Sequence, residues 1–238
     1  LRNTLKQTGE LRKLVGAAAR QARRVLGNAK KRAGRAGKRG QRATAGLARE
    51  IELADRVAEQ TRRRLAGETN IVDRLVSLCD LEARPIRHGS LRKPTEFGYK
   101  LALGDTPEGF VIAHDVHIGA PPDTDTLEPV LRKAKAMGMQ IRTVLADRGF
   151  GNEIADQVLA AANILDKVIP RVGRADPRES TRRWRRRYRF RAGVEGRISA
   201  LKRRYGIRRS RLKGHAGVRI WVGFGILANN LDRIAALA

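Results

Sequence analysis

The chain has 238 residues, of which 51 are Lys or Arg and 24 are Asp or Glu, so its formal net charge is +27. This cationic excess predicts a polyanionic partner, and nucleic acid is the first candidate. No apolar run is long enough to predict a transmembrane helix or a secretory signal, and the single Cys79 excludes an internal disulfide. We therefore expect a protein of a reducing cytosol with no membrane partner.

Residues 1–70 read as a separate basic helical arm, because Ala, Arg and Lys dominate up to about residue 66. Gly34, Gly37 and Gly40 form a helix-breaking stretch between two helical patterns, which predicts a basic helical hairpin. Two roles stay open and are compatible: a solvated arm, or a clamp on the DNA backbone, since an exposed basic helix also binds phosphate. The apolar positions expected on the two stripes are Leu5, Leu11, Leu14, Val15, Ala18, Val25 and Leu26, then Ile51, Ala54, Ala58, Thr61 and Leu65.

Residues 71–238 show strand and helix signals in alternation. Alternating apolar residues at 97–103 and 110–118, joined by a turn, predict an antiparallel hairpin. Antiparallel strands followed by alternating helices and strands indicate an α/β fold, with a mixed sheet covered by helices. The later elements expected are a helix at 127–137, a strand at 141–147, a helix at 153–162, a strand at 167–170, a basic helix at 183–204 interrupted near Gly193, and an apolar C-terminal helix from 220 that closes the core.

Asp147 stands at the carboxyl end of an expected strand and is followed by Arg148-Gly149-Phe150. Ligands of open α/β sheets gather outside such strand ends, and a Gly here permits a tight, exposed turn. From these residues alone, Asp147 is either a cap of the following turn or a functional acid.

Glu195 is an acid in the most basic part of the chain. On a helix it shares one stripe with Arg191, Tyr188 and Lys202. One interpretation is an ordinary salt bridge to Arg191. The other is a metal-holding acid at a nucleic-acid surface, since nearby cations keep a carboxylate ionised.

The spacing of Tyr188, Arg191, Glu195 and Lys202 resembles the Tyr-Arg-Glu-Lys signature of bacterial insertion-sequence DDE transposases. The segment 146–150 resembles the box that carries the second catalytic Asp of those enzymes. The resemblance covers about residues 71–235. Other similar segments are Asp80-Leu81-Glu82-Ala83-Arg84, Gly98-Tyr99-Lys100, and the loop residues Gly119, Ala120 and Asp123.

This resemblance implies a ribonuclease-H-like fold in residues 71–238, with three carboxylates that hold two Mg²⁺ or Mn²⁺ ions. Such ions activate the attacking oxygen and stabilise the leaving oxygen in phosphoryl transfer, and they prefer carboxylate ligands. Asp147 and Glu195 are then two of the catalytic metal ligands. The expected substrate is double-stranded DNA, both transposon ends and target, in the bacterial cytoplasm at the nucleoid. A homodimer is expected because two ends must be paired.

The expected DNA contacts extend from this signature into a phosphate track. By resemblance, Tyr188, Arg191 and Lys202 contact phosphates near the cleaved end. Dense cations at 182–187 and 202–213 add to the track. The residues we single out for DNA binding are Tyr188, Arg191, Lys202, Arg148, Arg183 and Arg186.

The context of the family's first catalytic Asp is missing from this sequence. Asp73 and Asp80 are the candidates within reach, and Asp80 aligns better with a family position that is not a metal ligand. We therefore expect an incomplete catalytic region that lacks its first strand. Two functions remain: a transposase catalytic region, and a non-catalytic basic nucleic-acid-binding remnant or factor. A nuclease or resolvase on the same fold is a weaker third.

Overall fold

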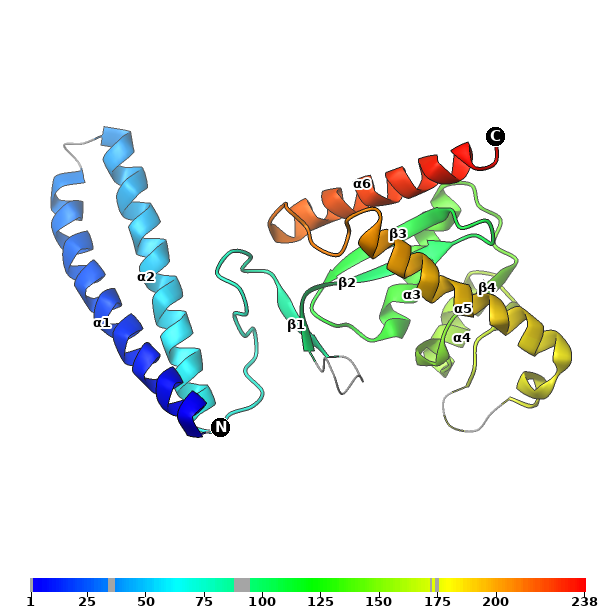
Figure 1. The fold of residues 1–238 in the computed structure, drawn as a ribbon, viewed down its shortest axis with the longest axis horizontal. Coiled ribbons are helices and arrows are strands. Elements are labelled where there is room, and N and C mark those ends of the chain that lie inside the picture. Colours follow the sequence, from blue (N-terminus) through cyan, green and yellow to red (C-terminus); the bar gives the residue numbers. More distant parts are fainter. Residues whose placement is uncertain (1, 34–36, 88–94, 172, 174–175) are drawn as a thin grey trace. The chain divides into compact units, whose positions relative to one another are not determined.

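The structure is a computed structural model that describes residues 2–33, 37–87, 95–171, 173 and 176–238. The chain divides into two compact units, Leu1–Leu81 and Glu82–Ala238. The first is helical, and the second mixes helices with short strands, which makes it an α/β unit (Figure 1).

Two long helices, α1 (Arg2–Ala33) and α2 (Gly37–Leu65), pack along each other in the first unit (Figure 1). Their least exposed positions recur at alternating steps of four and three residues, which is the spacing of a coiled-coil seam. Most side chains on the seam are small, so the two backbones can approach closely. The seam residues are Thr8, Arg12, Val15, Ala19, Ala22, Leu26 and Ala29 on α1, and Gly40, Thr44, Leu47, Ile51, Ala54, Ala58, Thr61 and Leu65 on α2.

The apolar stripe expected on α1 is partly wrong. Leu5, Leu11, Leu14 and Val25 are exposed, whereas Ala19 is only 4% exposed. Val15 and Leu26 of the expected stripe do lie on the seam, together with small residues that permit close packing. On α2, by contrast, the five positions expected from Ile51 to Leu65 all lie on the seam.

The glycines between the helices act differently from one another. Gly34 lies outside the described residues. Gly37 starts α2 with a φ of 62°, a left-handed conformation that suits glycine. Gly40 was expected to break the helix, but it lies within α2 and the helix continues through it.

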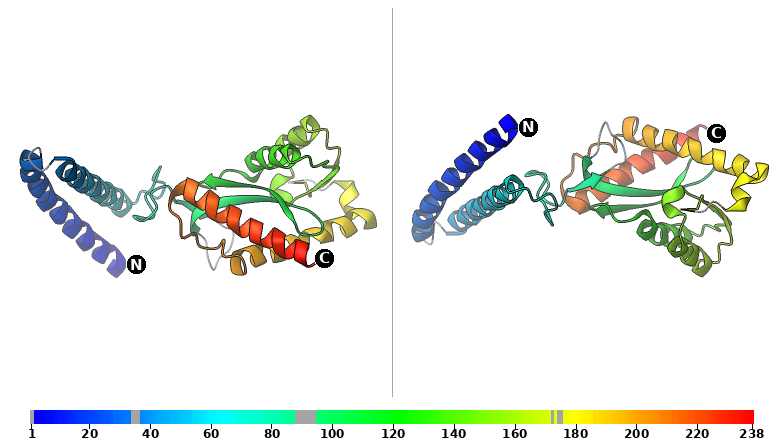
Figure 2. Two further views of the ribbon diagram at one scale, coloured as in Figure 1. Left: turned by 90° about the horizontal axis from the view of Figure 1, so that it is seen from above. Right: turned by 90° about the horizontal axis from the view of Figure 1, so that it is seen from below.

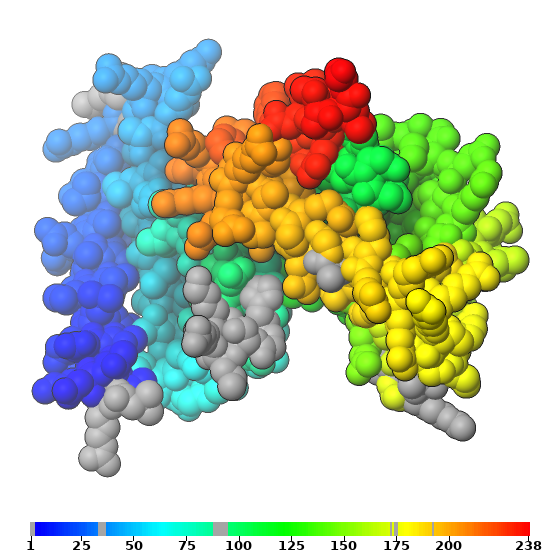
Figure 3. All heavy atoms as spheres, turned by 45° about the vertical axis from the view of Figure 1, so that its right-hand side comes forward, coloured from blue at the N-terminus to red at the C-terminus, as the bar shows by residue number. Residues whose placement is uncertain are grey.

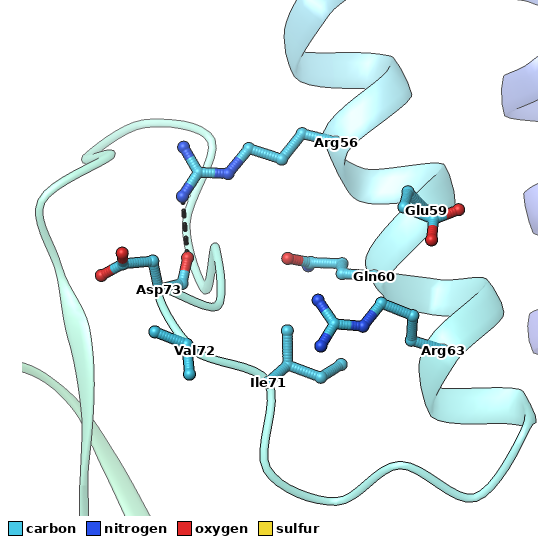
Figure 4. A pocket seen from close by; sticks show the side chains of 7 residues that line it. All are labelled: Arg56, Glu59, Gln60, Arg63, Ile71, Val72 and Asp73. Atoms are coloured by element: carbon cyan, nitrogen blue, oxygen red, sulfur yellow. Dashed lines mark hydrogen bonds between the residues drawn. The ribbon is translucent and has the colours of Figure 1, made fainter.

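The segment after α2 is fastened to that helix by side-chain-to-backbone hydrogen bonds. The Gln60 amide donates to the Leu75 carbonyl at 2.8 Å and accepts the Leu75 N–H at 3.0 Å. Arg56 donates to the Asp73 carbonyl at 2.8 Å, beside a small pocket lined by both residues (Figure 4). Residues 66–83 contain no helix or strand. Asp80, one of the candidates for the first catalytic Asp, therefore does not end a strand.

A three-stranded antiparallel sheet in the order β1-β2-β3 forms the centre of the second unit. Its strands are β1 (Arg84–Arg87), β2 (Thr95–Asp105) and β3 (Val111–Ile118). The expected β2–β3 hairpin is confirmed, with Leu101 opposite Val116. Asn230 of the last helix extends this hairpin, because its side chain bonds both the N–H and the carbonyl of Val111.

A second, parallel pair is formed by β4 (Thr143–Leu145) and β5 (Asp166–Val168). Helices α3 (Asp123–Ala136) and α4 (Glu153–Ala161) pack beside it. The strands of the described residues thus form two sheets, where one mixed sheet was expected. The reason is that no described strand pairs with both β2 and β4.

Helices cover both faces of the β2–β3 hairpin (Figure 2). On one side Val116 packs with Val222 of α6 (Gly214–Ala235) and Leu201 of α5 (Arg182–Arg203). On the other side Ala113 packs with Val130 of α3. A further cluster that includes Leu159 joins α3, α4 and the parallel pair.

The two C-terminal helices differ from expectation in two respects. Helix α5 continues through Gly193, where an interruption was expected. An interior glycine costs only ~1 kcal/mol, and ion pairs on both sides of it, Arg187–Asp166 and Arg197–Asp105, hold α5 in place. Helix α6 closes the core with one face only, since Phe224, Leu227, Leu231 and Ile234 are each more than half exposed. None of the helices in the described ranges is long and apolar enough to cross a bilayer.

Candidate active site

Asp147 lies where β4 ends and the short 3₁₀ helix η1 (Arg148–Phe150) begins. Its Oδ1 accepts the N–H of Gly149 at 2.9 Å, so the carboxylate caps the turn. The turn-capping interpretation of Asp147 is therefore correct, but it uses one oxygen and leaves Oδ2 for a second contact.

Arg191 of α5 connects Asp147 with Glu195. Its Nη2 lies 3.2 Å from Asp147 Oδ2, and its Nη1 lies 3.8 Å from Glu195 Oε1. The expected i, i+4 pair on α5 thus exists, and the same guanidinium also reaches the end of β4. Asp147 and Glu195 are 40% and 76% exposed, so both carboxylates are open to a ligand from solvent.

Arg187 fixes α5 against the parallel strand pair. Its guanidinium donates to Asp166 at 2.9 Å and to the Thr143 hydroxyl at 3.1 Å. The hydrogen bond from Arg187, helped by one from Thr143, lowers the pKa of Asp166 from 3.8 to about 2. Arg187 therefore serves the fold, which removes it from the phosphate track expected at 182–187.

Tyr188 supports Arg191 from the same helix. Its ring stacks on Trp184 with centroids 4.8 Å apart, and the Arg191 guanidinium carbon lies 6.0 Å from the Tyr188 centroid. Both aromatic rings are half-buried. The stack holds the start of the Tyr-Arg-Glu stripe in one arrangement next to Asp147.

Asp123, a loop residue of the resemblance, also lies at this site. It begins α3 and pairs with Lys100 of β2 at 2.7 Å. A Cβ added to Gly149 would clash with Asp123 Oδ2 and would lie 3.0 Å from Asp147 Oδ1. Asp123 and Asp147 thus lie on either side of Gly149, and the only sequence signal was the resemblance of its loop.

Residues 77–231 match the protein family described as the Transposase DDE domain. This chain is a DDE transposase family member. No curated protein and no solved structure matches it. Transposases of this family act on DNA and generally use divalent metal ions, and the match does not favour the non-catalytic alternative.

The transposase unit presents cations that the fold itself does not use. Figure 3 shows the side chains of α5 as a continuous band, yellow to orange, that leads into the segment before α6. Four of the expected DNA contacts are exposed and form no ion pair in the described part of the chain: Arg148, Arg183, Arg186 and Lys202.

The fit of a metal ion to this candidate site is partial. Asp147 and Glu195 offer the carboxylate oxygens that hard divalent ions prefer. However, no three Asp, Glu, His or Cys side chains of the described residues lie close enough together to hold a metal. The remaining candidates, Asp73 and Asp80, belong to the first unit.

Proposed function

We propose that the second unit is the catalytic region of an insertion-sequence transposase, which cuts transposon ends and joins them to target DNA with Mg²⁺ or Mn²⁺. The observation that carries this proposal is the position of Arg191, which contacts both Asp147 and Glu195. Forty-four residues separate Arg191 from Asp147 in the sequence, yet the fold brings them together at the end of a strand.

A ribonuclease-H-like core is part of the proposal. Its support is an antiparallel hairpin, a parallel strand pair and helices on both faces within one unit. Among the described residues, the part of β2 from Leu101 to Asp105 pairs only with β3, and β4 pairs only with β5. The single mixed sheet of a ribonuclease-H-like core would need one further strand that pairs with both β2 and β4.

Asp147 and Glu195 would hold the metal, which when bound activates the attacking oxygen and stabilises the leaving oxygen. In the present arrangement the single positive charge of Arg191 lies beside both carboxylates. A guanidinium forms forked hydrogen bonds with phosphate as readily as with carboxylate. Arg191 would therefore release the two acids and bind a DNA phosphate instead. This exchange would free the acids and place the phosphate beside them.

The exposed cations around the acids would position the DNA. Lys202 follows Glu195 by two helical turns on α5, and Arg148 follows Asp147 directly. Contacts of this kind go to phosphates, so they fix the duplex in register without reading its sequence. Arg183 and Arg186 extend the same function toward the start of α5.

Cleavage of DNA that carries the element's ends, measured with and without Mg²⁺ or Mn²⁺, tests this proposal. Asp147→Asn and Glu195→Gln should each abolish metal-dependent cleavage and leave DNA binding within about threefold. The matched controls, Asp125→Asn and Glu128→Gln, remove exposed acids of α3 and should leave cleavage intact. Cleavage that survives both site changes would refute the proposal. DNA binding without any cleavage by the unsubstituted chain would favour a non-catalytic binding protein.

A further inference from the structure

Positive charge in the first unit is concentrated at one end of the helical hairpin. No acid occurs between Glu10 and Glu50, a span with 13 Lys and Arg, whereas residues 50–81 contain 7 acids and 5 Lys and Arg. The end of α1 and the start of α2 lie together at that end (Figure 1). We call this end the hairpin tip, and its described cations are Lys30, Lys31, Arg32, Lys38, Arg39 and Arg42.

The cations of the hairpin tip take no part in holding the first unit together. All six are exposed. Ion pairs of the described part of this unit, such as Arg23–Asp55, Arg62–Glu59 and Arg63–Glu68, join other residues. The six charges therefore remain available to a ligand from solution.

Helix stability explains the cations at the end of α1 but not those at the start of α2. Cations in the last turn of a helix are favourable, which accounts for Lys30, Lys31 and Arg32 on α1. Lys38 and Arg39, however, stand at the start of α2, where no acid occurs in the first turn. Cations there oppose the helix dipole and so destabilise the start of the helix. A loss of helix stability of this kind is expected where the charges serve to bind a ligand.

The chemistry of the first unit selects the phosphate backbone of a duplex as the ligand. Residues 1–81 contain no Phe, Tyr or Trp. The unit thus lacks the rings that stack on single-stranded bases and the aromatic anchors that hold basic helices at a membrane. Lys and Arg without aromatics match the contacts that proteins make to duplex phosphates.

We propose that the hairpin tip is a second, sequence-independent binding site for the DNA backbone, separate from the acids and cations around α5. The inference rests on the proposed function in one respect, since it takes DNA as the substrate. It adds a separate contact that would hold flanking or target DNA while the second unit acts on the transposon end.

Salt titrations test the hairpin tip by measuring how tightly the full chain binds a DNA duplex as the salt concentration rises. The duplex has about 30 base pairs and contains no element sequences, which leaves room for several phosphate contacts. The test variant is Lys31→Gln, Lys38→Gln and Arg42→Gln combined. The matched control is Arg49→Gln, Arg64→Gln and Arg74→Gln, which removes the same charge from the same unit outside the tip. Gln keeps a good helix propensity, and far-ultraviolet circular dichroism checks that the hairpin stays folded.

The tip variant should lose at least about tenfold in affinity at low salt, and the slope of log affinity against log salt should fall by about 2 to 3. The control should change affinity less than about threefold. Equal effects of the two triples, or binding of the tip to anionic vesicles but not to DNA, would overturn the inference. Asp147→Asn should keep the full salt slope, so loss of cleavage and loss of tip binding are separate results.

Discussion

Arg191 Nη2 and Asp147 Oδ2 lie 3.2 Å apart, which joins the middle of α5 to the end of β4. The same guanidinium lies 3.8 Å from Glu195. One side chain thus holds together the two acids that we assign to metal binding. In the proposed mechanism this guanidinium would leave the acids when a phosphate competes for it.

Replacement of Arg191 tests this bridging role. Arg191→Gln should lower single-turnover DNA cleavage on the order of 10²-fold, the usual cost of one lost charge-stabilising donor in an active site. Arg191→Lys should restore little, because an ammonium cannot make the forked contact. Arg189→Gln, on the exposed face of the same helix, is the control and should weaken DNA binding only slightly. Equal cleavage by the Arg191 and Arg189 variants would show that the bridge has no role.

Gly149 should not tolerate a side chain. A Cβ there would clash with Asp123 and crowd Asp147, so Gly149→Ala should destabilise the unit by about 1–3 kcal/mol and abolish cleavage. Gly196→Ala is the matched control, since a Cβ at that position of α5 has nothing within 4 Å. It should stabilise the helix by about 0.5–1 kcal/mol. Urea unfolding measures both, and an unchanged midpoint for Gly149→Ala would contradict the packing described.

The Arg187–Asp166 pair should make stability depend on pH in the acid range. Hydrogen bonds from Arg187 and Thr143 lower the pKa of Asp166 to about 2. Ionised Asp166 therefore stabilises the fold above its ordinary pKa, and this contribution disappears as the pH falls from about 4 to about 2. Because Asp166 is half exposed, Arg187→Gln should cost only about 1 kcal/mol or less at pH 7.

Urea midpoints at several pH values measure this effect. The difference between Arg187→Gln and the unsubstituted chain should shrink on acidification. Arg186→Gln, one residue earlier, should leave stability unchanged at every pH and weaken DNA binding instead. A pH-independent cost for Arg187→Gln would mean that packing, not the ion pair, carries its contribution.

Local patterns predicted much of the second unit. Alternating apolar residues gave the β2–β3 hairpin, and helical spacing gave α3 and α4 to within a few residues. These signals lie within single elements. The spacing from Tyr188 to Lys202 and the Asp147 turn could be found for the same reason, since each lies on one element.

Contacts between distant elements were not predictable from the sequence. Nothing local shows that Arg187 pairs with Asp166 or that Asp123 borders Gly149. The buried face of α1 was also not predictable from hydrophobicity alone. On α1 the small Ala19 lies on the seam and is buried, whereas the larger Leu14 lies beside the seam and is exposed.

Iron-directed cleavage of the protein backbone would test the central claim most directly. Fe²⁺ replaces the divalent ion in the presence of DNA. Added hydrogen peroxide oxidises it to Fe³⁺ and yields hydroxide and a hydroxyl radical, which cuts the chain near the bound metal. The proposed site predicts cuts next to both Asp147 and Glu195, lost together in Asp147→Asn and in Glu195→Gln. Cuts at only one of the two acids, or at neither, would contradict a single metal site shared by β4 and α5.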